Sequence, residues 1–237
     1  MLMPLKAISA LLSYPSADLQ AAGDEIIAAL NVDLGQGALL PPATLHALAA
    51  LVREISDGDL YDLQESYVGL FDRSRTLSLN LFEHVHGESR ERGGAMVDLL
   101  ENYRAAGFEP ASSELPDHLP VLLEFLAMRP LGEAQEVLAD AAHILEALET
   151  RLTRRESAYS AVFAALRHIS GVTADQEALA ELLAIEDDDP DDLEALDEVW
   201  EESEVTFAPD PKAGCPQVRD MLAQMDTPIN VPSQAAE

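Results

Sequence analysis

Apolar residues recur at helical spacing along most of the first 185 residues. Residues 1–12 already carry leucine and isoleucine on one face of an amphipathic helix, and residues 88–106 show the clearest pattern. In that segment four apolar residues fall at positions i, i+3, i+4 and i+7: Met96, Leu99, Leu100 and Tyr103. We predict helices over nine ranges: 1–12, 16–30, 44–55, 59–71, 88–106, 119–128, 137–152, 159–166 and 176–185.

Strand signals are nearly absent, since β-branched residues are sparse and no segment alternates cleanly between apolar and polar positions. We therefore predict an all-α fold, a single helical-bundle domain over residues 1–185. Ser16 and Asp59 are expected to cap helices, and Gly107 to end one in the left-handed conformation.

Residues 186–237 differ in character. They combine an acidic run with a segment that carries five prolines in residues 206–237 and has no periodicity. Low hydrophobicity and self-repulsion predict a flexible acidic tail, with a transient helix over 193–200. Trp200 is either an anchor for that helix or part of a solvated tail.

Charge limits the partners of this chain. Forty-four acids oppose 14 Lys and Arg, which gives a formal net charge of −30. Such a charge repels nucleic acid and anionic membrane surfaces, so neither is expected as a partner, and a basic partner is favoured. No run reaches the ~18 apolar residues of a membrane span, and the N-terminal run reads as a helix rather than a signal peptide.

The single cysteine, Cys215, excludes a disulfide framework or thiolate metal cluster within one chain and favours a reducing compartment. We therefore expect a cytoplasmic protein. The sequence assigns no role to Cys215.

Two acid-x-x-His pairs suggest a metal site. Glu83 and His86 would lie one helical turn apart, as would Asp140 and His143, which resembles the spacing in di-iron carboxylate bundles. Those bundles use Glu in both pairs and need two further inward Glu residues. A helical metal-dependent enzyme using these four residues is therefore the alternative to a binding protein.

The segment SSELPDHLPVLLEFL places Pro116 and Pro120 at the start of a helix, where their missing N–H groups cost nothing. Asp117 is expected to cap that helix, which leaves Glu114 and His118 unexplained. The pair Gly93–Gly94 is expected to allow close packing of a neighbouring segment.

Two short motifs resemble a known family. Residues 67–71, YVGLF, match an aromatic-x-x-Leu-Phe motif, and residues 114–118, ELPDH, match an E-x-P-D-H motif. Both are typical of the helical chaperones that mature molybdenum oxidoreductases, the TorD/DmsD/NarJ group. The similarity covers residues 60–130 closely and is specific to the nitrate reductase branch, because the block FEHVHGESR lies between the motifs.

The resemblance implies a non-enzymatic chaperone that binds the N-terminal leader-like segment of the nitrate reductase catalytic α subunit. The client would be held until molybdenum bis(guanine dinucleotide) cofactor is inserted, with cofactor-delivery proteins as further partners and no cofactor bound stably by the chaperone. A third possibility is a general acidic scaffold, which would bind unrelated basic peptides equally well.

The resemblance also implies a client-binding site. Its residues come from the two motifs: Tyr67, Leu70, Phe71, Glu114, Pro116, Asp117 and His118. The aromatic residues would form an apolar wall and the carboxylates would contact a basic peptide. Because Asp117 adjoins His118 and favours its protonated form, we expect client affinity to vary between about pH 6 and 8.

A nearly neutral segment between the motifs is interpreted as support for this site. Its polar residues are Asp72, Arg73, Arg75, Glu83, His84, His86, Glu88, Arg90 and Arg92. The arginines are expected to pair with the acids, because clustered charges need partners. The histidines are expected to satisfy buried backbone groups or to contact the client.

Overall fold

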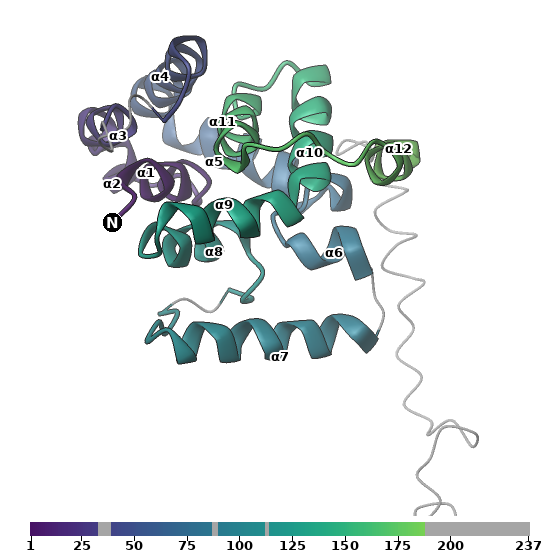
Figure 1. Cartoon of the computed structure of the whole chain (residues 1–237). Helices are drawn as coiled ribbons and strands as arrows, with labels where there is room; N and C mark the ends of the chain where they lie inside the picture. The colour runs from purple at the N-terminus through teal and green to yellow at the C-terminus, as the bar shows by residue number, and fades with distance from the viewer. Residues whose placement is uncertain (33–38, 87–89, 112–113, 188–237) are drawn as a thin grey trace, which may run out of the picture. The chain divides into compact units, whose positions relative to one another are not determined.

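The computed structural model describes residues 1–32, 39–86, 90–111 and 114–187 (Figure 1). Within these ranges the chain forms α-helices, one π-helix and one 3-10 helix and no strand, which confirms the all-α prediction. In chain order the elements are α1 Met3–Leu11, α2 Ala17–Ala21, α3 Gly23–Leu30, α4 Pro42–Asp57, α5 Leu60–Tyr67, η1 Val68–Asp72, η2 Arg75–Leu77, α6 Leu81–His86, α7 Arg90–Ala105, α8 Leu119–Ala127, α9 Leu131–Asp140, α10 Ala142–Arg154, α11 Ser160–Ser170 and α12 Gln176–Ala184.

Local capping explains several of these boundaries. The Ser16 hydroxyl accepts a hydrogen bond from the Leu19 N–H at the start of α2, and Asp59 caps α5 through two backbone N–H groups. At the other end of α7, Gly107 has φ 75° and lets the Phe108 N–H reach the Tyr103 carbonyl at 2.9 Å. These three predictions are confirmed.

Two predicted helices are wrong because each is broken at an alanine. The range 16–30 divides into α2 and α3 at Ala22, and the range 137–152 divides into α9 and α10 at Ala141, whose φ and ψ are −92° and 5°. The first break directly precedes Gly23, whose low helix propensity is a local signal that the prediction did not use. At Ala141 the sequence carries no such signal, because alanine has the highest intrinsic helix propensity.

The buried face of α1 forms part of the hydrophobic core. Helix α1 packs on α3 and α8, and α10 packs on α11 and α12 (Figure 1). Leu5, Ile8 and Leu11 of α1 are fully buried, as the periodicity predicts. The Leu2 N–H donates to the Ala127 carbonyl at 2.6 Å and the Ser9 hydroxyl to the Pro120 carbonyl at 2.8 Å, so α1 runs antiparallel to α8.

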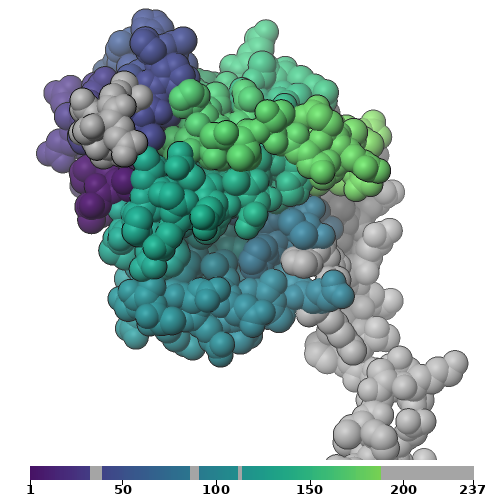
Figure 2. Space-filling view, viewed as in Figure 1, coloured from purple at the N-terminus to yellow at the C-terminus, as the bar shows by residue number. Residues whose placement is uncertain are grey.

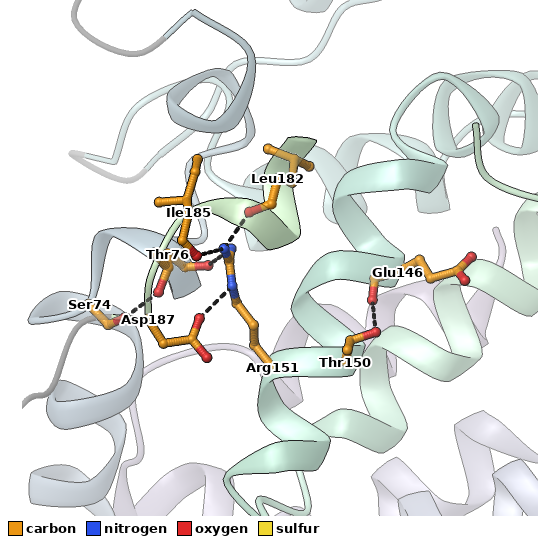
Figure 3. Close-up of polar contacts among 8 residues, drawn as sticks. All are labelled: Ser74, Thr76, Glu146, Thr150, Arg151, Leu182, Ile185 and Asp187. Carbon is orange, nitrogen blue, oxygen red and sulfur yellow. Dashed lines mark hydrogen bonds and ion pairs between the residues drawn. The ribbon is translucent and has the colours of Figure 1, made fainter. Parts of the chain in front are cut away.

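A buried arginine attaches α12 to this bundle (Figure 3). Arg151 of α10 is 1% exposed and donates hydrogen bonds to the carbonyls of Thr76, Leu182 and Ile185 at 3.0, 2.6 and 3.1 Å. Its Nε lies 2.6 Å from Asp187 Oδ1. Sequence periodicity did not single out this residue, although it holds together three segments distant in sequence.

Helix α7 uses only part of its surface for packing. Tyr103 is fully buried, whereas Leu99 and Leu100 are half-buried and Val97 is 56% exposed. A Cβ added at Gly93 or at Gly94 would meet nothing within 4 Å. The prediction that this glycine pair permits close packing is therefore wrong, because both residues face open space.

The chain divides into one unit over Met1–Pro190 and a second over Asp191–Glu237. The predicted tail from residue 188 onward, including Trp200 and Cys215, lies outside the described residues, so its flexibility stays a prediction. In the part of the chain that the structure describes, no helix has the length and apolar character that crossing a membrane requires.

Candidate functional site: a groove between helices α1 and α8

The first family-like motif lies where α5 changes into a π-helix. Tyr67 ends α5, and the following five residues form η1, in which the Arg73 N–H reaches back to the Val68 carbonyl at 3.0 Å. Such wider turns are often found at functional sites, because they change the direction in which the next side chains point. Here the π-helix follows Tyr67 directly and ends at the exposed Asp72.

Tyr67 and Phe71 belong to a cluster of aromatic rings. The ring centroids of Tyr67 and Phe71 lie 5.0 Å apart, and those of Phe71 and Tyr159 lie 5.2 Å apart. The Tyr67 hydroxyl donates to the Leu12 carbonyl at 2.7 Å, and burial raises the pKa of this phenol. Both motif residues are 5% exposed, so they mainly support the end of α1.

The second motif pairs with the chain that precedes α6. The Leu119 N–H donates to the Leu79 carbonyl at 2.8 Å, and the Leu81 N–H donates to the Asp117 carbonyl at 3.2 Å, on either side of an isolated bridge between Asn80 and His118. Two blocks that the sequence separates by more than 30 residues therefore lie side by side. This pairing fixes the position of residues 114–118.

Asp117 does not cap its own helix, contrary to the prediction. Its Oδ2 accepts a hydrogen bond from the Phe82 N–H at 2.9 Å and so caps the first turn of α6. Helix α8 instead begins after His118, which makes no side-chain cap. Asp117 is 1% exposed, and burial raises the pKa of its carboxyl group.

A groove of about 460 Å³ opens where these segments meet the C-terminal end of α1 and the start of α8. Residues from three separate parts of the chain line it: Ser9, Ser13, Tyr14, Tyr67, Asp72, Glu114, His118, Pro120, Val121 and Glu124. We call this cavity the α1/α8 groove. Its walls combine aromatic and aliphatic surface with three carboxylates and no Lys or Arg.

The charges in the α1/α8 groove influence one another. Burial, followed by the neighbouring Glu114, raises the pKa of Asp72, whereas His118 acts in the opposite direction. The pKa of His118 is lowered, because burial outweighs the attraction of Glu114, Asp117 and Asp72 for its proton. Asp117 does favour the charged form of His118, as the sequence predicts, but burial has the larger effect on the pKa of His118.

The structure brings together part of the predicted site. Tyr67, Glu114 and His118 line the α1/α8 groove, and so does Asp72, which we expected only as support. Leu70, Phe71, Pro116 and Asp117 lie behind it: Leu70 and Phe71 pack in the core, and the Pro116 carbonyl accepts a hydrogen bond from the Tyr103 hydroxyl at 2.7 Å. Whether any of these residues contacts a client stays a prediction.

Sequence reasoning missed the groove residues contributed by α1 and α8. Ser9, Ser13 and Tyr14 lie about 100 residues from the second motif, so no local pattern connects them. Glu124 is the one charged residue in the apolar helix α8, LPVLLEFLA, and this position could have indicated an exposed functional face.

Two of the contacts expected among the supporting residues are present. Arg92 forms an ion pair with Glu83 at 3.2 Å, and His84 Nε2 lies 2.9 Å from the Ser78 carbonyl. Since a carbonyl only accepts hydrogen bonds, this Nε2 carries a proton. Arg73 is exposed. Glu88 and the side chains of His86 and Arg90 lie outside what the structure describes.

The alternative metal site loses its geometric basis. Asp140 ends α9 and His143 lies in α10, so they do not share one helix as the spacing argument required. Glu83 is occupied by Arg92. Among the described residues, no group of three or more His, Cys, Asp or Glu could hold a metal ion.

The fold belongs to a class already known from a solved structure. The chain resembles a crystal structure described as that of a redox enzyme maturation protein from Archaeoglobus fulgidus, with a TM-score of 0.52 and 23% identity, over 73% of this chain and 94% of the other. At this identity the similarity shows a shared fold alone.

Sequence comparison identifies the family. Residues 38–165 match the family described as nitrate reductase delta subunit, and the chain belongs to it. The chain is 45% identical to the nitrate reductase molybdenum cofactor assembly chaperone NarJ of Escherichia coli K12, over 90% of this chain and 88% of that protein. It is 37% identical to NarW of the same strain, named as a probable chaperone of the same kind, over 89% and 86%. The resemblance inferred from the motifs is confirmed, and so is the interpretation as a chaperone rather than an enzyme.

Proposed function

We propose that this chain is an assembly chaperone of respiratory nitrate reductase that holds the N-terminal segment of the catalytic α subunit in the α1/α8 groove. The observation that carries this proposal is the lining of the groove. It brings Tyr14, Tyr67 and Val121 together with the carboxylates of Asp72, Glu114 and Glu124. Apolar walls with an acidic rim suit a polypeptide that is both apolar and basic.

The distribution of burial supports a division of roles within the groove. Tyr14 is 51% exposed and contacts the buried Tyr67 edge to face, with ring centroids 5.6 Å apart. An exposed aromatic ring held by a rigid buried partner is the kind of residue that dominates peptide interfaces. Asp72, Glu114 and Glu124 are exposed and would contribute long-range attraction that salt weakens.

The proposal extends to the cofactor and the compartment. NarJ of Escherichia coli K12 is named for assembly of the molybdenum cofactor of nitrate reductase. We infer that this chain keeps its client competent for insertion of molybdenum bis(guanine dinucleotide), which belongs to the client. It would act in the cytoplasm, where cofactor-delivery proteins meet the unfinished enzyme.

Titration calorimetry with a synthetic peptide from the α subunit N-terminus tests the proposal. Phe71→Ala and Asp117→Ala are unsuitable variants, because both residues are buried and their loss would disturb the fold. We expect Tyr14→Ala to weaken binding by on the order of 2 kcal/mol, as for a central aromatic contact. The triple variant Asp72→Asn, Glu114→Gln, Glu124→Gln should weaken it about tenfold at low salt, which corresponds to about 1.4 kcal/mol.

A second triple variant provides the matched control. Asp98→Asn, Glu101→Gln and Glu136→Gln remove the same number of charges from exposed positions that do not line the groove. Its affinity should stay within about twofold of the unmodified chain. Equal losses in both triple variants would show a general acidic scaffold, and no loss in either would refute binding in this groove.

The lowered pKa of His118 changes the expected pH dependence. A neutral imidazole does not oppose a basic peptide, whereas an imidazolium does. Since the pKa lies below its ordinary value of 6.5, affinity should be constant above about pH 7 and fall as the pH drops below 6.5. Protonation of Asp72, whose pKa is raised by burial, acts in the same direction at lower pH. His118→Gln should therefore flatten the upper part of the profile.

A further inference from the structure

A cavity of about 210 Å³ lies among η2, α6, α7, α10 and α12 and shares no lining residue with the α1/α8 groove. Figure 2 shows α6 between α12 above and the first turns of α7 below. Three of the eight residues that line the cavity are arginines, Arg75, Arg92 and Arg151, and we call it the arginine cavity. The chain has 14 Lys and Arg against 44 acids, so this gathering of arginines is contrary to its overall charge.

The fold brings these arginines together from segments that lie far apart in the sequence. Arg75 and Arg92 belong to the nearly neutral segment between the two motifs, whereas Arg151 comes from α10. Arg151 is 1% exposed, donates to three backbone carbonyls and pairs with Asp187 (Figure 3). It therefore contributes positive charge to the wall of the arginine cavity rather than a hydrogen bond to a ligand.

Arg92 has hydrogen-bonding capacity beyond its ion pair. Its side chain is 20% exposed, and its Nη1 lies 3.2 Å from Glu83 Oε1. A guanidinium group carries five N–H donors, so this ion pair with a described residue leaves most of them for another acceptor. Arg75 is exposed and adds a further positive charge to the lining.

Positive charges in the arginine cavity outnumber the acids beside them in the part of the chain that the structure describes. Glu83 is the acid in the lining, and Asp187 pairs with Arg151 at its edge. Three arginines against these two acids leave an excess of one positive charge. His84 does not alter this balance near neutral pH, because burial lowers its pKa and the charge of Arg151 acts in the same direction.

We propose that the arginine cavity binds a phosphate group, either as the free ion or at the end of a small phosphate ester. The guanidinium group of Arg92 would donate to its oxygens, because the planar fork of arginine matches phosphate geometry, and Arg75 and Arg151 would add attraction. The volume of about 210 Å³ is below the roughly 300–1,000 Å³ of ordinary small-molecule sites. The cavity therefore suits the phosphate group, and the remainder of an ester would lie outside it.

Arginine side-chain NMR on the full chain tests this site without any client peptide, so its failure would leave the proposed function untouched. Inorganic phosphate, methyl phosphate and acetate are titrated at about pH 7.5 and constant ionic strength. The Nε–H signal of Arg92 is the reporter, and that of Arg129, outside the cavity lining, is the reference. Phosphate is mostly dianionic at this pH and should bind at least about fivefold more tightly than acetate, which carries one charge. Tighter binding of methyl phosphate than of inorganic phosphate would identify an ester as the ligand, and equal or weaker binding the free ion.

The two members of the ion pair give opposite expectations, measured from ³¹P line widths. Arg92→Gln should weaken phosphate binding by about fivefold or more, whereas Glu83→Gln should strengthen it by about threefold, because it removes the competing carboxylate. Arg129→Gln breaks a separate ion pair with Glu133 and, as the matched control, should leave phosphate binding unchanged. Equal shifts of the Arg92 and Arg129 signals in the unmodified chain would overturn the proposal, and so would equal binding of phosphate and acetate or weaker binding by Glu83→Gln.

Discussion

The carboxylate of Asp117 joins two segments that lie 35 residues apart in the chain. One oxygen holds the first turn of α6, and the residue's own carbonyl accepts the Leu81 N–H. A short loop between two prolines is thereby fixed against α6, and His118 is brought to the edge of the α1/α8 groove. The position of the groove residues thus depends on a side chain that does not line the groove.

We predict that Asp117→Ala destabilises the fold by about 1–3 kcal/mol, because it removes the buried hydrogen bond between the Phe82 N–H and the carboxylate. Asp117→Asn should cost less than about 0.5 kcal/mol at neutral pH, since it keeps an acceptor and removes a buried charge. Urea unfolding measures both values. Asp140→Ala, at an exposed position, is the control, and equal losses for Asn and Ala would contradict the assigned hydrogen bond.

The buried histidines predict a pH dependence of stability. Burial lowers the pKa of both His84 and His118 below 6.5, so the unfolded chain binds more protons than the folded chain just below that pH. The free energy of unfolding should fall as the pH drops from about 7 to 5.5, by at most about 1.4 kcal/mol per pH unit for each histidine.

Replacing both residues by glutamine should flatten this slope, whereas His46→Gln at an exposed position should not. The raised pKa values of Asp72 and Asp117 act in the opposite direction, because the folded state then binds protons more readily. Comparing these variants separates the contribution of the histidines to the pH dependence from that of the aspartates. An unchanged slope in the double variant would contradict their burial as its cause.

At the residue scale, local patterns predicted caps and the helix stop but not long-range partners. Ser16, Asp59 and Gly107 behave as expected because their partners lie within five residues along the chain. The position of Asp117 just before α8 also suggested a cap of that helix, but its hydrogen-bond partner is the Phe82 N–H in α6. Contacts of this kind depend on the tertiary fold, which a local pattern does not contain.

Among the elements, α7 combines a buried anchor with an exposed start. Tyr103 is held by a hydrogen bond to the Pro116 carbonyl and by ring contacts with Phe108 and Phe125. Near the opposite end, Glu91 and the glycine pair are exposed. Of the residues of α7, Leu99 lines the cavity of about 290 Å³ whose wall also includes Asp117.

We predict that Gly93→Ala and Gly94→Ala each stabilise the chain by about 0.5–1 kcal/mol, because both lie inside a helix with room for a Cβ. Slower hydrogen exchange in α7 and a higher urea midpoint would report this gain. Gly107→Ala is the contrasting variant, with an expected loss of about 1–2 kcal/mol from its positive φ. Destabilisation by the first two substitutions would show that the glycines serve a contact.

Arg151 gives α12 its attachment, so we predict that Arg151→Met costs about 3–5 kcal/mol by leaving three carbonyls and Asp187 without this donor. Hydrogen exchange should accelerate first in α12. Arg154→Met, exposed on the same helix, should change stability by less than about 0.5 kcal/mol. Equal exchange rates of α12 in both variants would contradict the anchoring role.

Apolar periodicity predicts most of the helices but not where they are interrupted. The apolar spacing predicted the helices and the buried face of α1, because a 3.6-residue repeat determines which side chains face a core. It did not predict the breaks at Ala22 and Ala141 or the π-helix after Tyr67.

For the whole molecule, the chain belongs to the nitrate reductase delta subunit family and carries a formal net charge of −30. Such a charge favours a basic partner over nucleic acid, and this preference stays a prediction. The motifs alone located three of the ten residues that line the α1/α8 groove, Tyr67, Glu114 and His118. Most of the others emerged only when the fold brought residues 9–14 next to residues 120–124.

Site-specific photo-crosslinking tests the central claim, occupancy of the α1/α8 groove by the client, most directly. A benzoylphenylalanine placed at Tyr14 would lie in the groove, and one at Tyr61, which is 80% exposed and outside the groove lining, provides a matched control. With the intact α subunit as client, we predict crosslinks from position 14 to the N-terminal segment of the α subunit and none to that segment from position 61. Equal crosslinking from both positions, or none from position 14, would contradict the account.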